Sequence, residues 1–327
     1  MLIKFSEIEN LTMLSQFLYI KEDNLLTLLK EGAVSSCCEK MAIPKKNRAL
    51  GYRVVYKVNS HLLKNVHKVL CGHLNAVYDA PAFVHGFVLG GCTRRNAAQH
   101  LNKKKILGLD IDRFFDSISE NAIKEVFCGL GCRMNIAANL SKLTTINGRL
   151  PQGFNTSPVL ANIMFGHLDA QLNSICNDYG CIYTRYADDI TISTDDQLPP
   201  VARINDVLFT GGFRLNSSKE RVMFRGKKQY VTGLTVFDPE YPRVPKRFKR
   251  RIRLQLYYLV KFGAKSYVMR ELGLSEEDVR NDYEKLQLVS GRKVQLQYQI
   301  KGWIDYVNSI EPLLSEKYYE SYNAIAW

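Results

Sequence analysis

The chain has 327 residues, of which 46% are hydrophobic and 24% charged, a composition that excludes a disordered protein and allows a globular core. The net charge of +13 favours a polyanionic partner, nucleic acid before a membrane surface. We expect a cytoplasmic protein, because no apolar run reaches the roughly 18 residues of a membrane span and no secretory signal is evident at the N-terminus.

The first third of the chain predicts helices interrupted by one hairpin. Apolar residues at helical spacing predict helices in the first forty residues, with Gly32 as a stop, and another helix over 61–78. Between them, residues 41–60 combine a basic turn with β-branched and aromatic alternation, which predicts a hairpin. A glycine-studded loop, "HGFVLGGCTRRNAAQHL", follows.

The middle of the chain predicts strands that alternate with helices. The apolar run "ILGLDI", residues 106–111, is typical of a buried strand, and Ser119 can cap the helix that follows it. The loop "LPQGFNTSP" leads into a helix with Ser157 as N-cap and Pro158 as its first residue. A hairpin over 182–193, a helix near 199–210 and short strands around 220–225 and 229–236 complete this region.

The last part of the chain is predicted to be mostly helical from residue 246 onwards, and its start is strongly basic. Residues 241–270 carry Lys and Arg throughout but no Asp or Glu, whereas a solvated helix face normally mixes both signs. If this region is helical, Arg247, Arg250, Arg251 and Lys261 could share a face, with Leu254, Leu256, Tyr257, Leu259 and Val260 packing on others. A solvated basic helix is the alternative.

Three carboxylates stand at strand ends. Asp110 ends the buried strand, and Asp188 and Asp189 lie between "IYTRY" and "ITIS". Neighbouring carboxylates raise each other's pKa, so a fold that keeps them favours a compensating cation such as Mg²⁺. If the two elements share a sheet, the carboxylates meet at one edge, as in two-metal phosphoryl transfer. For an isolated Asp pair, an ordinary turn is the alternative.

The motifs together resemble those of reverse transcriptases over residues 41–235. They are "IPKKNRALGYRVVY", "LDIDRFFDSIS", "RLPQGFNTSP", "YADD" and "GFRLNSSKE", in that order. "NAAQH" and "VTGL" resemble two motifs of bacterial retron reverse transcriptases, and a group II intron-like enzyme is the alternative. The sequence departs from the family at Arg113, where an acidic residue is common, and at Phe154 and Asn155, where smaller residues are common.

The resemblance implies an α+β fold, a right-handed polymerase with fingers, an antiparallel-sheet palm and a helical thumb. The implied boundaries are 1–105 for the fingers (with part of 119–150), 106–239 for the palm and 240–327 for the basic thumb. The implied function is RNA-directed DNA synthesis from dNTPs on a cognate structured non-coding RNA. Priming from an RNA 2′-OH would give RNA-linked DNA, in an anti-phage defence system with an effector protein. The alternative is a scaffold that binds RNA or RNA–DNA and restrains an effector.

The resemblance also implies roles at individual positions. Asp110, Asp188 and Asp189, with the backbone of Ile111, would hold two Mg²⁺ ions, while Asp112 is expected in a salt bridge. Phe115 would be the steric gate that excludes a 2′-OH, or else core. Nucleotide contacts are expected from Lys45, Lys46, Arg53, Gln152, Gly153 and Lys219, the last as a proton donor to pyrophosphate. The alternatives are an ordinary turn for Gln152 and Gly153, a solvated basic hairpin for Lys45, Lys46 and Arg53, and an exposed lysine for Lys219.

RNA contacts are implied at positions spread over the chain. They are Asn96, His100, Thr232, Gly233, Arg247, Arg250 and Arg251. Nothing pairs His100 with a nucleophile, so a catalytic role is not expected for it. Bracing of the palm by a satisfied structural histidine is the alternative. Thr232 and Gly233 are expected on a strand near the primer, where glycine allows close backbone approach.

Overall fold

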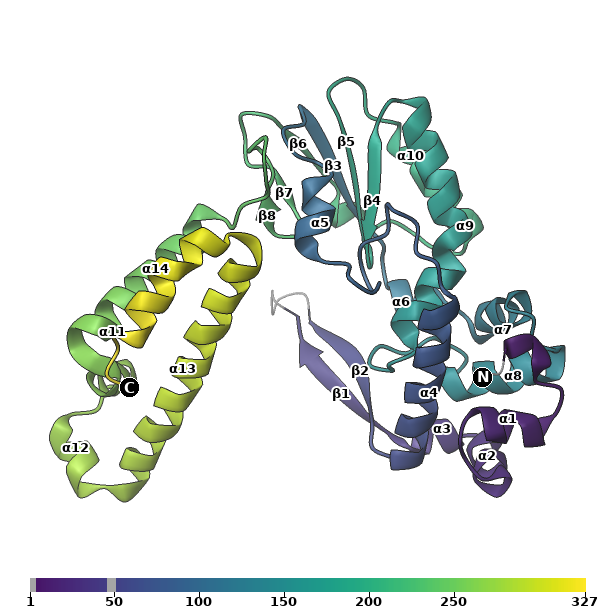
Figure 1. Ribbon diagram of the computed structural model, residues 1–327, viewed down its shortest axis with the longest axis horizontal. Coiled ribbons are helices and arrows are strands. Elements are labelled where there is room, and N and C mark those ends of the chain that lie inside the picture. The colour runs from purple at the N-terminus through teal and green to yellow at the C-terminus, as the bar shows by residue number, and fades with distance from the viewer. Residues whose placement is uncertain (1–3, 46–50) are drawn as a thin grey trace. The chain divides into compact units, whose positions relative to one another are not determined.

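The computed structural model describes residues 4–45 and 51–327, and the chain divides into two units, residues 1–227 and 228–327 (Figure 1). Both units are built from helices and antiparallel strands, which confirms the predicted α+β class. The finer boundaries of fingers, palm and thumb stay predictions. Within the described ranges, every helix is too short or too polar to cross a bilayer.

The first unit begins with short helices, a hairpin and one long helix. These elements are η1 (Phe5–Glu7), α1 (Leu11–Phe17), α2 (Glu22–Leu29), α3 (Ala33–Ser36), β1 (Cys38–Pro44), β2 (Tyr52–Val58), α4 (His61–Val77) and α5 (Thr93–Ala98). The strands β1 and β2 pair antiparallel from Cys38 opposite Val58 to Pro44 opposite Tyr52, so the predicted hairpin is confirmed. Gly32 lies just before α3 rather than at the end of a helix.

A four-stranded antiparallel sheet forms the centre of the first unit. Its strands are β3 (Lys105–Asp110), β4 (Ile182–Tyr186), β5 (Asp189–Thr194) and β6 (Arg221–Phe224), in the order β4-β5-β3-β6. The two central strands are almost entirely buried, as their continuous apolar runs predict. Because β3 and β5 run in opposite directions, the end of β3 meets the start of β5 at one edge of the sheet.

Helices cover the sheet and complete the core. They are α6 (Phe114–Ser117), α7 (Glu120–Gly129), α8 (Met134–Thr144), α9 (Ser157–Asp178), α10 (Val201–Thr210) and η3 (Ser217–Lys219). Figure 1 shows α9 running beside β4. Ser119 caps α7 as predicted, by accepting a hydrogen bond from the Ala122 amide. The predicted cap of α9 is wrong by one residue, because Thr156 is the N-cap and the Ser157 hydroxyl donates to the Pro151 carbonyl instead.

The second unit consists of a minimal hairpin and four helices. Its elements are β7 (Tyr230–Val231), β8 (Leu234–Thr235), α11 (Lys246–Leu272), α12 (Glu276–Asn281), α13 (Tyr283–Ile310) and α14 (Pro312–Asn323). The single strand predicted over 229–236 is wrong, because Thr232 and Gly233 turn the chain with φ of 46° and 84°. Within α11, Gly263 has φ of 75° and breaks the helix.

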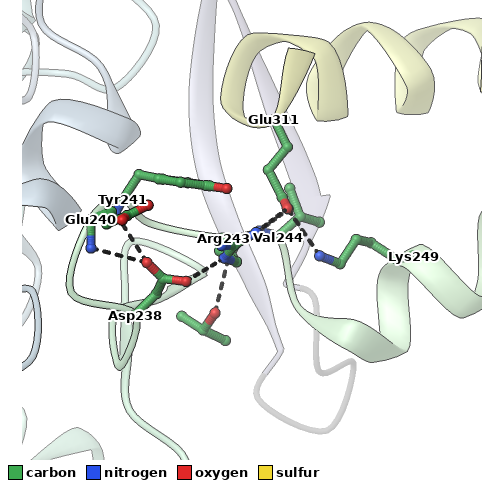
Figure 2. Close-up of polar contacts among 8 residues, drawn as sticks. Asp238, Glu240, Tyr241, Arg243, Val244, Lys249 and Glu311 are labelled. Atoms are coloured by element: carbon green, nitrogen blue, oxygen red, sulfur yellow. Dashed lines mark hydrogen bonds and ion pairs between the residues drawn. The ribbon is translucent and has the colours of Figure 1, made fainter. Parts of the chain in front are cut away.

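A buried carboxylate ties the parts of the second unit together (Figure 2). Glu311, at the start of α14, accepts hydrogen bonds from the Val244 amide at 2.8 Å and from Lys249 Nζ at 3.0 Å. Arg243 lies 3.6 Å from the same carboxylate and also donates to Asp238 at 2.6 Å. The entry to α11 is thereby fixed against the junction of α13 and α14.

Candidate active site

The sheet brings the three predicted carboxylates to one edge. Asp110 and Asp189 are register partners on β3 and β5, and Asp188 lies in the turn between β4 and β5. The Ile111 amide donates to the Asp188 carbonyl at 3.0 Å, which fixes the turn against the end of β3. The preceding residue, Ala187, has φ of 59°, a conformation that costs free energy for any residue except glycine.

The carboxylates are electrostatically coupled. Partial burial, together with the charges of Asp188 and Asp110, raises the pKa of Asp189 to about 6. Burial and the Asp110 charge raise the pKa of Asp188 as well. Lys219 Nζ, from η3, donates to Asp110 Oδ1 at 2.6 Å and supplies a positive charge at this edge. Asp112 is exposed and forms the predicted salt bridge, with Arg113 at 3.9 Å.

The donor set fits a divalent cation that keeps water and substrate ligands. Carboxylate oxygens are the ligands that Mg²⁺ prefers, and burial together with the neighbouring carboxylates raises the pKa values of Asp188 and Asp189, which a bound cation would reverse. Among residues 4–45 and 51–327, no three His, Cys, Asp or Glu side chains are gathered closely enough to form a ready-made metal cage. Any ion at this edge therefore needs ligands beyond the side chains, such as water, backbone carbonyl or phosphate oxygens.

A pocket of about 680 Å³ in the first unit contains the predicted nucleotide residues Phe115, Gln152 and Gly153. Phe114 is buried in the core, where it contacts the rings of Phe165 and Phe213, while Phe115 is half-buried and lines the pocket. Of the two adjacent phenylalanines, the structure thus leaves Phe115 as the one that can meet a ligand.

The loop after Leu150 is fixed to the hairpin of β1 and β2. The Tyr56 amide donates to the Gln152 carbonyl at 2.8 Å. Gly153 has φ of 109°, and a Cβ there would lie 2.4 Å from the Tyr56 carbonyl oxygen, so only glycine fits. The structure therefore gives Gly153 a role in holding the pocket wall against β2, which the sequence did not reveal.

The predicted triphosphate cations lie outside the pocket lining. Arg53 is exposed opposite Ile43, and Lys45 is exposed just after β1. Lys46 lies outside the described residues. The pocket instead contains Lys68, on α4, with Gly72 and Asn75 one and two turns further along. Sequence reasoning missed these residues, and their spacing of four and three along one helix face was the available signal.

Asn96 and His100, two of the predicted RNA contacts, lie inside the first unit. Both are fully buried, and the two ring nitrogens of His100 lie 2.7 Å from the hydroxyl oxygens of Ser193 and Thr184. His100, just after α5, therefore joins this part of the chain to β4 and β5, and burial lowers its pKa to about 3. Burial favours the alternative of bracing the sheet, which accounts for the contacts of His100, while direct RNA contact by these side chains stays a prediction.

The basic helix of the second unit exposes the predicted arginines and some predicted packing residues. Arg247, Arg250 and Arg251 are exposed, with Arg251 also 4.5 Å from the centre of the Trp303 ring. Leu256 and Leu259 are buried as expected. The expectation that their apolar neighbours pack inside is wrong, since the following side chains are exposed: Leu254, Tyr257 and Val260.

Comparisons with known proteins identify the family. The profile described as "Reverse transcriptase (RNA-dependent DNA polymerase)" matches residues 43–236. The retron Ec86 reverse transcriptase of Escherichia coli is 30% identical over 66% of this chain and 68% of its own. The retron Mx65 reverse transcriptase of Myxococcus xanthus is 32% identical over 60% of this chain, but the match spans only 50% of that enzyme. The retron Ec73 reverse transcriptase of E. coli is 26% identical over 90% of this chain and 93% of its own. The chain belongs to the reverse transcriptase family, among the retron reverse transcriptases.

Proposed function

We propose that this chain copies a structured non-coding RNA from its own locus into DNA, by adding dNMP units to a hydroxyl and releasing pyrophosphate. The observation that carries the proposal is the placement of Asp110 and Asp189 as register partners, with Asp188 in the adjoining turn. The pocket lined by Phe115 and Gln152 supplies a site for the incoming nucleotide. By likeness to the retron enzymes, priming comes from an RNA 2′-OH, and the product is RNA-linked single-stranded DNA.

Different residues of the chain would bind the metal ions, select the sugar and donate a proton. Asp110, Asp188, Asp189 and the Ile111 carbonyl would hold two Mg²⁺ ions, which supply positive charge for the attacking hydroxyl and the departing pyrophosphate. Phe115 closes the pocket where a ribose 2′-OH would lie. Lys219, already hydrogen-bonded to Asp110, is the proton donor to pyrophosphate.

Cations on the β1–β2 hairpin, on α4 and on α11 would bind the polyanions. Lys68 in the pocket lining, with Arg53 and Lys45 on the exposed hairpin outside that lining, would bind the triphosphate. On α11, the arginine triplet (Arg247, Arg250 and Arg251) binds phosphates of the RNA or of the RNA–DNA product. The RNA–DNA product and an effector protein from the same locus are the proposed partners in anti-phage defence.

The carboxylates provide the test of this function. Asp188→Asn and Asp189→Asn should each lower Mg²⁺-dependent DNA synthesis by about three orders of magnitude or more, because the metal contribution is several kcal/mol. RNA binding in gel shifts should stay near the wild-type level. Asp112→Asn is the matched control, since Asp112 is exposed and pairs only with Arg113 among the described ion pairs.

The outcomes separate polymerase from scaffold. Robust DNA synthesis by either carboxylate variant would refute the metal assignment. If both variants lose synthesis yet still support defence in cells, the chain acts as a scaffold that restrains the effector, and copying is secondary.

A further inference from the structure

The loop before α5 places a strained aromatic residue in the nucleotide pocket. Phe87 lines the pocket, is 39% exposed, and has φ of 61°. A bulky residue in this backbone region is an outlier that costs about 1–3 kcal/mol and persists only where its surroundings impose it. The contacts around Phe87 must therefore impose this backbone conformation.

One buried amide holds the loop in place. Asn162, fully buried on α9, donates from Nδ2 to the Gly86 carbonyl at 3.0 Å and to the Phe87 carbonyl at 3.3 Å. On the other side, a Cβ on Gly86 would lie 2.2 Å from the Ala187 nitrogen. The loop is therefore pinned between α9 and the turn that presents Asp188.

A buried guanidinium orients that amide and the catalytic turn together. Arg185 Nη1 donates to Asn162 Oδ1 at 3.0 Å and to the Ala187 carbonyl at 3.1 Å. Its Nε and Nη2 donate to Asp169 at 2.8 Å and 2.6 Å, and neither side chain is exposed. Because Arg185 takes the Asn162 oxygen, the amide nitrogen is left to face Gly86 and Phe87.

The ring of Phe87 lies against the ring of Phe115. Their centres are 5.8 Å apart with an angle of 50° between the planes, which is a favourable aromatic contact. The ring of Phe114 also contacts Phe115, with the two ring centres 5.4 Å apart. Phe115 is thus held between a core ring and a pocket ring, and only the pocket ring belongs to the strained loop.

We propose that Phe87 is a specificity-determining residue of the nucleotide pocket: its ring backs Phe115 and prevents that ring from tilting away from the sugar. Asn162 is the positioning residue that keeps Phe87 in place. The inference rests on the proposed function and names a second determinant of sugar choice within it. Without the Phe87 ring, Phe115 gains room to move, and a 2′-OH can be accommodated.

The test compares kcat/KM for dNTPs and rNTPs. Phe87→Ala should lower the preference for dNTPs about tenfold, as expected when one steric contact in a pocket is lost. Phe87→Leu, which keeps part of the side-chain bulk, should lower the preference for dNTPs by less. If the alanine variant does not fold, the leucine variant still tests the inference. Leu89→Ala is the matched control, because Leu89 lies in the same loop at 84% exposure and outside the pocket lining.

Asn162→Ala separates positioning from general damage. It should shift the sugar preference in the same direction as Phe87→Ala, and the double variant should shift it less than the two changes added, because both act on one contact. A uniform loss of activity with an unchanged dNTP-to-rNTP ratio in the Phe87 variants would overturn the inference.

Failure of the inference is distinguishable from failure of the proposed function. If the wild-type protein makes no DNA, the proposed function fails. If Phe115→Ala changes the ratio and Phe87→Ala does not, only the role of Phe87 is lost.

Discussion

Replacing Arg185 by Met should strongly destabilise the first unit. Arg185 and Asp169 are both completely buried, and their ion pair is 2.6 Å long. After the change, Asp169 keeps only the Tyr183 hydroxyl, at 2.6 Å, among the partners that the described residues provide. An uncompensated buried charge of this kind costs about 3–5 kcal/mol, a large part of the total of about 5–15 kcal/mol for a typical protein.

The distribution of two residue types allows each unit to be followed separately. All eight cysteines lie in the first unit, and Cys132, Cys176 and Cys181 are buried. Burial raises the pKa of Cys176 to about 12, so its thiol reacts only when the fold opens. Both tryptophans lie in the second unit. In a urea titration of the Arg185→Met variant, pulsed thiol labelling should show a lower unfolding midpoint for the first unit. The midpoint of the tryptophan fluorescence transition, which reports on the second unit, should fall by less.

A double variant tests the cause. Arg185→Met combined with Asp169→Leu removes the buried charge, so it should be more stable than the single variant by at least about 1 kcal/mol. It stays below wild type because the Tyr183 hydroxyl and the Asn162 oxygen lose their partners. A single variant that loses less than about 1 kcal/mol, or a double variant no more stable than the single, would refute the reasoning.

Three further predictions follow from the described contacts. Burial lowers the pKa of His67 to about 4 and that of His100 to about 3, so the unfolded chain binds more protons than the folded chain below pH 6.5. Each histidine should therefore contribute about 2 kcal/mol of stability that is present at pH 7 and lost at pH 5. A urea midpoint that does not change between pH 7 and pH 5 would contradict this prediction. Phe115→Ala should raise kcat/KM for rNTPs relative to dNTPs by about 10–200-fold; an unchanged ratio would place the gate elsewhere. Changing the arginine triplet to Gln should flatten the salt dependence of RNA binding by about 0.7–0.9 per lost contact, whereas identical slopes would favour a solvated helix.

The local parts of the site could be predicted from the sequence. The buried strand ending at Asp110 and the hairpin around Asp188 follow from apolar runs that stop at charged residues. Motif resemblance assigned Phe115 and Gln152, and both lie in the pocket. These features depend on neighbours within a few residues, which is the range over which a single sequence is informative.

The long-range parts could not be predicted. His100 is satisfied by hydroxyls 84 and 93 residues away, so only the folded sheet shows that it is buried. Asn162 reaches Gly86 across 76 residues, and no spacing in the sequence marks the pair. The turn at Thr232 and Gly233 could have been predicted from the sequence, because a glycine inside a short strand pattern often signals a break in the strand.

The contact between Lys219 and Asp110 has an evolutionary consequence. The two residues are 109 positions apart, yet each neutralises the other at the carboxylate edge. A descendant that lost Asp110 would leave Lys219 without its hydrogen-bond partner, with only the charges of Asp188 and Asp189 nearby, and a descendant that lost Lys219 would keep less compensated negative charge. We expect chains that have given up copying to lose the acid and the lysine together, so that the pair records whether a lineage still synthesises DNA.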